Sequence, residues 1–266
     1  MRKMLFICMG LGFLVTSIAT ASDVVSTNIV GYLKTTATGK YFTSGPTFVQ
    51  VLTFQDSSNP QWRLGDIIAE GMDPGEDFIQ FINPGNAKVR LAATYIPKSD
   101  PVFGGWWDKD ALDNMDYDPA NRLDDMFFPV SEGFLCYFET SGIELTYAGE
   151  VLTGSQEIIL DGKYNLVANF LPTDILLGDV SAEGMDPGED FVQFINPSNA
   201  KVSLAATYIP KSDPVFGGWW DKDALDNMDY DSENRLDGKL LPAGTVVLTY
   251  FASSPISIIF PDPLNF

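Results

Sequence analysis

The 266-residue chain contains no histidine. This absence excludes Ser-His-Asp and Cys-His nucleophilic systems and any zinc site that uses histidine ligands. The sequence also lacks the glycine-rich loops that cradle phosphate groups in nucleotide-binding proteins. Carboxylates and aromatic side chains are therefore the groups left to carry binding or chemistry, and we do not expect an enzyme.

Basic residues are scarce: 16 lysines and arginines stand against 36 aspartates and glutamates, a formal net charge of −20. A field of this sign repels phosphate backbones and anionic membrane surfaces, so we do not expect nucleic-acid binding. The same excess of carboxylates favours solubility and attracts cations.

The N-terminus has the pattern of a secretory signal peptide. Arg2 and Lys3 precede an apolar run at residues 4–18, and the small-x-small segment 19–21 follows it. The run is shorter than the roughly 20 residues that a membrane-spanning helix needs. We therefore expect cleavage after residue 21, a secreted or cell-surface location, and no transmembrane span in the exported chain.

Cysteine is nearly absent, since only Cys8, inside the apolar run, and Cys136 occur. Once the signal peptide is removed, Cys136 has no partner within the chain, which excludes an intramolecular disulfide. Because Cys136 lies in the hydrophobic stretch 133–138, we expect it to be buried in a strand.

A fifty-residue block occurs twice, at residues 69–118 and 182–231. The two copies differ at three positions: Ile79 for Val192, Gly85 for Ser198 and Arg90 for Ser203. A period this long indicates two domain-sized copies and not a solenoid. The flanking sequence has drifted further than the block. We therefore predict a signal peptide at 1–21, a first β module at 22–149 and a second at 150–266.

Alternating apolar residues predict β-strands in both halves. The clearest alternations are Val89, Leu91, Ala93 and Tyr95; Ile143, Leu145 and Tyr147; Val246, Leu248 and Tyr250; and Ile256, Ile258 and Phe260. Turn signals such as the Asp-Pro-Gly of residues 73–75 separate these runs. The expected fold is all-β, with two tandem sandwich- or barrel-like modules and short helical turns.

One short helix is expected within the block. Trp107, Ala111, Leu112 and Met115 have helical spacing, and Asp108 is placed to cap the start of the helix. At under three turns, this helix would depend on packing against the rest of the module for its stability.

Several short motifs carry a resemblance. They are residues 28–32 (NIVGY), 105–108 (GWWD), 129–138 (PVSEGFLCYF) and 162–169 (GKYNLVAN). Together they resemble the opening strand, Gly-Trp turn, "GEGFFV" strand and "GYNLVGNP" strand of tandem-repeat secreted β-module proteins from Verrucomicrobia-like bacteria. The first copy departs at 39–44, which lacks the Asn-Leu pair, and the second at 242–246. The resemblance implies tandem extracellular β-modules and says little about chemistry.

Each copy of the block contains five aspartates within eleven residues. These are Asp108, Asp110, Asp113, Asp116 and Asp118, and then Asp221, Asp223, Asp226, Asp229 and Asp231. Calcium takes six to eight oxygen ligands, so the composition suits Ca²⁺, although the spacing is not that of an EF-hand. Two interpretations stay open: calcium-binding segments, or solvated acidic faces.

The adjacent tryptophans of the block suggest a second kind of site. Trp106 and Trp107, with Trp219 and Trp220, could stack on sugar rings if their faces are exposed. Because neighbouring strand residues point to opposite sides, one tryptophan of each pair is expected to pack inward while the other stays undecided. A glycosidase would need two carboxyl groups about 5–10 Å apart, and the sequence singles out no such pair.

These observations favour an exported, non-enzymatic structural or adhesive protein of the cell surface or extracellular matrix. Ca²⁺ is its candidate cofactor, and its candidate partners are further copies of itself or an extracellular polysaccharide. The alternatives are a bivalent carbohydrate-binding protein that uses the tryptophan pairs and, less favoured, a glycosidase. Two equal surfaces on tandem modules would bind with avidity.

Overall fold

The computed structural model describes residues 30–37, 39–46, 61–152, 154–196, 199–252 and 255–263. The predicted signal peptide lies outside these residues. Antiparallel strands dominate the described chain, and the helices are short, which confirms the all-β prediction. Among the described residues, no helix combines the length and the apolar character that a membrane span requires.

The strands of the first half are β1 (Val30–Thr36), β2 (Tyr41–Ser44), β3 (Gln61–Arg63), β4 (Ile68–Glu70), β5 (Phe78–Ile82), β6 (Val89–Ile96), β7 (Gly105–Asp108), β8 (Phe127–Pro129), β9 (Phe134–Tyr137) and β10 (Glu144–Glu150). Those of the second half are β11 (Gln156–Leu160), β12 (Tyr164–Ala168), β13 (Ile175–Leu176), β14 (Ser181–Glu183), β15 (Phe191–Ile195), β16 (Val202–Ile209), β17 (Gly218–Asp221), β18 (Leu240–Leu241), β19 (Val246–Tyr250) and β20 (Ile256–Phe260). The helical elements are η1 (Leu64–Asp66), α2 (Lys109–Asp113), η2 (Pro119–Asn121), η3 (Leu177–Asp179), α3 (Lys222–Asp226) and η4 (Ser232–Asn234).

The two halves have the same sheet topology. In the first half the sheets have the orders β1-β10-β4, β2-β9-β5-β6-β7 and β3-β8. In the second half they are β11-β20-β14, β12-β19-β15-β16-β17 and β13-β18, so each strand takes the place of the strand ten earlier. Within the described chain the sheets are open and their strand pairs antiparallel, as in a sandwich-like fold.

Each half has its own hydrophobic core. The first core contains Trp62, Phe81 and Phe134. The alternating apolar residues of segments 143–147 and 256–260 are buried, as predicted. Cys136 is buried in β9, as predicted, and burial raises the pKa of its thiol; among the described residues it is a free cysteine. Val89 is an exception to its alternation, because it begins β6 at the exposed end of the strand.

A smaller apolar cluster joins the two halves: Ile82, Leu166, Ala168 and Val246. The backbone hydrogen bonds that span this contact include one from Ala168 N to Ser131 O at 2.9 Å and one from Gly45 N to Gly244 O at 3.1 Å. The register of the paired strands makes Gly45 the counterpart of Ala168 and Ser131 the counterpart of Gly244. Exchanging the halves therefore maps one hydrogen bond onto the other, as an approximate twofold relation requires.

The helix prediction is partly confirmed. Asp108 caps α2 by accepting from Ala111 N, as expected, but the helix covers only Lys109–Asp113. Trp107 belongs to β7, and Met115 lies beyond the helix end at φ 58° with its side chain 77% exposed. Met115 N donates to Leu112 O and Asp116 N to Ala111 O, both at 2.9 Å. This pair of hydrogen bonds is a Schellman closure, which ends the helix before Met115 can join its packed face.

Candidate functional site

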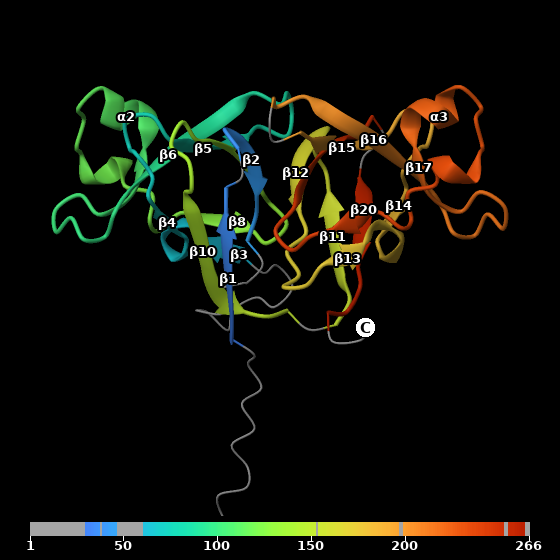
Figure 1. Cartoon of the computed structure of the whole chain (residues 1–266), viewed down its shortest axis with the longest axis horizontal. Helices are drawn as coiled ribbons and strands as arrows, with labels where there is room; N and C mark the ends of the chain where they lie inside the picture. The colour runs from blue at the N-terminus through green and yellow to red at the C-terminus, as the bar shows by residue number, and fades with distance from the viewer. Residues whose placement is uncertain are drawn as a thin grey trace, which may run out of the picture.

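Residues 97–126 and their counterparts 210–239 form a pair of projecting segments, which we call the wings. α2 and α3, one in each wing, lie at opposite ends of the longest axis of the molecule (Figure 1). Each wing follows a long strand of the five-stranded sheet, makes the edge strand β7 or β17, and continues into the short helices. Most of each wing comes from the duplicated block, so the two ends of the molecule carry nearly the same sequence.

A tight turn begins each wing. The Asp100 carboxylate accepts from Val102 N and Phe103 N, both at 2.9 Å, and the Asp213 carboxylate accepts from the counterparts Val215 N and Phe216 N at the same distances. These backbone N–H groups hold the pKa of Asp100 below its ordinary value. The ionised carboxylate is therefore the acceptor that closes the turn.

All four tryptophans of the block are buried, so none presents a free ring face for stacking on a sugar. Trp106 is fully enclosed, and its Nε1 donates to Ile67 O at 2.8 Å. Trp107 is 3% exposed, and its Nε1 donates to Phe103 O at 2.6 Å. The burial and bonds of Trp219 and Trp220 are the same.

The alternation of side chains along a strand did not decide whether the second tryptophan of each pair is exposed. The tertiary structure buries it. The turn that contains Phe103 packs against the Trp107 ring, with 6.1 Å between ring centroids. The Arg122 guanidinium lies over the same ring, 6.0 Å from its centroid, and Arg122 also pairs with Trp107 through the backbone. The Trp107 ring is therefore covered by the parts of the same wing that come just before β7 and after α2.

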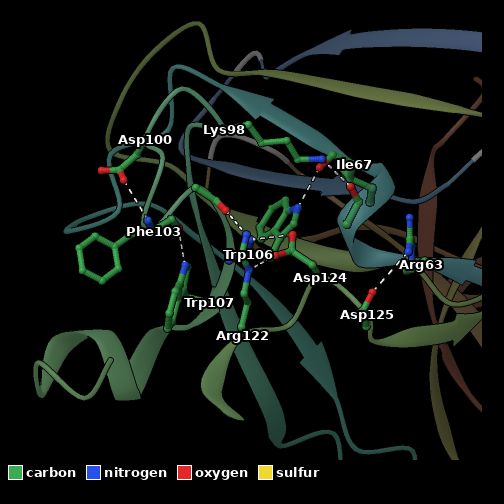
Figure 2. Close-up of polar contacts among 12 residues, drawn as sticks. Arg63, Ile67, Lys98, Asp100, Phe103, Trp106, Trp107, Arg122, Asp124 and Asp125 are labelled. Atoms are coloured by element: carbon green, nitrogen blue, oxygen red, sulfur yellow. Dashed lines mark hydrogen bonds and ion pairs between the residues drawn. The ribbon is translucent and has the colours of Figure 1, made fainter. Parts of the chain in front are cut away.

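A polar network holds each wing against its sheet (Figure 2). Asp124 accepts from Trp106 N at 3.2 Å and from Arg122 Nε at 2.5 Å, and Arg122 also donates to Gly104 O. Lys98 Nζ donates to Gly65 O at 3.0 Å. Arg235, Asp237 and Lys211 repeat these contacts in the second wing. Because the network is present twice and its groups bond to the protein itself, its role is to fix the wing.

An open hollow of about 650 Å³ lies beside the first wing and is lined by Arg63, Lys98 and Arg122 together with Asp124 and Asp125 (Figure 2). Arg63 donates to Asp66 at 2.8 Å and to Asp125 at 3.3 Å. In the second copy, 113 residues later, the counterparts of Arg63 and Asp125 are the uncharged residues Leu176 and Gly238. The charges of Arg63 and Asp125 are therefore not duplicated, whereas those of Lys98, Arg122 and Asp124 recur at Lys211, Arg235 and Asp237.

The aspartates proposed as metal ligands have local partners in the wings. Asp108 caps α2, Asp118 caps η2, and Asp113 pairs with Lys109 Nζ at 2.5 Å. Asp110 lies in the first turn of α2, where the positive end of the helix dipole favours a carboxylate. The second copy repeats these roles at Asp221, Asp231, Asp226 and Asp223.

Asp116 and Asp229 each accept, at 3.3 Å, from the backbone N–H two residues on. Within the described ranges, no three acidic or cysteine side chains gather closely enough to hold a metal ion. Calcium binding by these ten aspartates stays a prediction.

An apolar surface at the end of each wing was not anticipated from the sequence. In the first wing it comprises Val102, Phe103, Met115 and Tyr117, which we call the tip patch; the second tip patch comprises Val215, Phe216, Met228 and Tyr230. Phe103 is partly buried and the other three side chains are exposed, with matching exposure in the two copies. Sequence reasoning missed this surface because it assigned Met115 to the packed face of the helix.

A second hollow, of about 420 Å³, lies between the two halves. Its lining includes the side chains of Glu132, Asp161 and Asn165 among apolar residues. Burial raises the pKa of Glu132, even though the Arg90 guanidinium pairs with it and acts in the opposite direction. Arg90 is one of the three block differences; its counterpart Ser203 donates to Phe194 O at 3.0 Å instead.

Comparisons with models of protein families, with curated proteins and with solved structures found no match for this chain.

Proposed function

We propose that the chain is an exported, non-enzymatic structural or adhesive protein of the cell surface or extracellular matrix, which makes contacts through its two wings. The observation that supports this most directly is the placement of the wings. They have nearly the same sequence and the same internal contacts, and they lie at opposite ends of one molecule (Figure 1). Such a molecule can bridge two partners or bind one extended partner twice.

The difference between block and flanks supports this proposal. Residues of the flanks meet at the contact between the halves, where Gly45 faces Ala168 and Gly133 faces Val246. In each of these two pairs the residues are counterparts, one from each half, that touch across the approximate twofold axis. Two large side chains would clash there, so a change to one smaller and one larger residue removes the clash. The wings do not touch each other, and their sequences have stayed alike. Two equal surfaces increase overall affinity through effective concentration, without any new contact.

The partners proposed from the sequence, further copies of the chain or an extracellular polysaccharide, are compatible with this arrangement. The bivalent carbohydrate alternative loses its intended surface, because the four tryptophans are buried. The glycosidase alternative has one specific observation in its favour: Glu132, with its raised pKa, shares the lining of the hollow between the halves with Asp161. Glycoside hydrolysis uses two carboxyl groups that flank one bond, and the pKa of the one that acts as the acid is raised.

The proposal is tested by locating the protein and by measuring the cohesion of the cells that produce it. External protease should remove the protein from intact cells, or the protein should be found in the extracellular matrix, and deletion of the gene should weaken cell–cell or cell–matrix cohesion. Purified protein added back should restore cohesion. An intracellular location, or unchanged cohesion after deletion, contradicts the proposal. Release of reducing ends from a polysaccharide, lost in Glu132→Gln, would favour the glycosidase instead.

A further inference from the structure

The tip patches are exposed apolar surfaces on a strongly acidic protein. Met115 and Met228 are 77% and 78% exposed, and Val102 and Tyr117 are exposed as well, as are their counterparts Val215 and Tyr230. Single exposed apolar residues are common on protein surfaces. In each tip patch three exposed apolar side chains lie in the same wing as a partly buried phenylalanine, and a grouped apolar surface of this kind is a candidate binding surface.

The methionine of each tip patch is held in an unfavourable backbone conformation. Met115 has φ 58° and Met228 φ 56°, the left-handed region that glycine adopts far more easily than other residues. Both occupy the position after the helix cap where a Schellman closure usually has glycine. Packing does not explain the choice, because the side chains point into solvent. Methionine is a flexible, polarisable side chain that suits adaptable contacts with a partner.

The remaining residues of the patch are held in place before any partner binds. The rings of Phe103 and Tyr117 lie 4.9 Å apart between centroids, and Phe103 also packs on Trp107. The Asp100 carboxylate fixes the turn at Val102 and Phe103. Phe216 and Tyr230 repeat the ring contact at 4.7 Å. Pre-ordered anchors lower the entropy cost of association.

The negative charge around the tip patches favours a partner with basic side chains. Between residues 100 and 118 the chain has six aspartates and one lysine, and Asp116 stands between Met115 and Tyr117. A second copy of this chain, with its net charge of −20, would bring like charges together around the patch. An anionic lipid surface is repelled in the same way. A partner with basic side chains around an apolar or aromatic anchor meets both features of the patch.

We propose that each tip patch docks a basic segment of an extracellular polypeptide, with an apolar anchor against Met115, Val102 and Tyr117 and with lysines or arginines against the surrounding aspartates. This proposal rests on the proposed adhesive function and names its partner class. Because Met228 repeats Met115 at the far end of the molecule, one protein holds two such segments, and a surface dense in them is bound with avidity.

Surface plasmon resonance tests this with a synthetic peptide of repeated Lys-Trp-Lys-Leu on the chip and the same peptide with Glu for Lys as a reference. The variants are Met115→Gly with Met228→Gly, Met228→Gly alone, and Asp116→Asn with Asp229→Asn. The matched control is Val89→Ala with Val202→Ala, which alters exposed apolar residues of the same block outside the tips. Glycine suits the left-handed position, so the Met→Gly variants should keep or raise the melting temperature.

We expect the wild type and the control to bind the basic peptide and not the acidic one. The double Met→Gly variant should bind at least about tenfold more weakly, and Met228→Gly alone should lose avidity, which contributes about 10²–10⁴-fold for two linked sites. The Asp→Asn pair should weaken binding and its salt dependence. Equal binding by the wild type and the double Met→Gly variant overturns the proposal, as does no binding of the basic peptide.

Evidence that a different partner binds the tip patches would also overturn the proposal, and two such partners can be tested. One is a second copy, shown by a dimer in sedimentation that the double Met→Gly variant lacks. The other is a membrane, shown by binding to phosphatidylcholine vesicles that this variant loses. The cohesion phenotype of the deletion strain does not depend on these results, so failure of the tip proposal and failure of the adhesive function are distinguishable.

Discussion

Gly133 lies at the contact between the two halves, and adding one methyl group there should loosen that contact. A Cβ at this position would lie 2.4 Å from Cγ2 and 2.8 Å from Cγ1 of Val246, where ordinary contacts are 3.4–4 Å. The backbone is held as well, because Gly133 N donates to Leu166 O at 2.8 Å. Overpacking of this kind costs about 1–3 kcal/mol, and we expect Gly133→Ala to lower the free energy of unfolding by that amount.

Val246→Ala is the matched partner for a double-mutant cycle. Val246 is buried, and removing its two methyl groups should cost about 1.6 kcal/mol at about 0.8 kcal/mol per buried carbon, plus a cavity term. In the double variant the clashing Cγ atoms are gone, and the new Cβ of residue 133 fills part of the space. The double variant should therefore be more stable than the sum of the single changes predicts, by about 1–2 kcal/mol.

Urea unfolding followed by tryptophan fluorescence measures these free energies, and Gly238→Ala is the control. A Cβ at Gly238 would meet nothing within 4 Å, so its effect should stay within about 0.5 kcal/mol. Loosening of the contact should also broaden the transition or divide it in two, because each half has its own core. The reasoning is refuted if Gly133→Ala is as stable as the wild type, or if the two single effects add without coupling.

Three further predictions concern titratable groups. Because burial raises the pKa of Glu132, the stability that its protonated form contributes is complete below the ordinary carboxyl value of about 4.5 and is lost as pH rises through the folded value. The melting temperature of Glu132→Gln relative to that of the wild type should therefore increase as pH rises above about 4.5, and a constant difference would count against this. Burial also raises the pKa of Cys136, so a thiol-specific dye should label it at the rate of unfolding; immediate labelling of native protein at pH 8 would show that it is accessible. The calcium role predicted for the ten aspartates requires that calcium raise the melting temperature and that a chelator reverse the rise, and no response to either would end that hypothesis.

Local patterns predicted the features that depend on near neighbours. Period-two alternation at Ile256, Ile258 and Phe260 identified a strand and its buried face, and the structure confirms both. The hydrophobic setting of Cys136 indicated its burial correctly. Asp108 was correctly expected to cap a helix, since a capping side chain acts on backbone N–H groups only two or three residues away.

Features that depend on distant parts of the chain were missed or left undecided. The sequence did not decide whether Trp107 is exposed, because its cover comes from Phe103 and from Arg122, fifteen residues further on. Met115 was assigned to a packed helix face, because helical spacing does not show where a Schellman closure ends the helix. The tip patch was missed for the same reason.

The sequence by itself determined that the chain is built from β-strands, that it contains one unit twice, and that it is strongly acidic, since alternation, repetition and charge can each be read residue by residue. Only the tertiary structure decided where the two copies meet and what they expose. That outcome depends on contacts between residues far apart in the chain, such as Gly133 with Val246, and on the cover that each wing folds over its own tryptophan. Neighbouring residues do not encode such contacts, because packing is decided by whichever distant surface fits.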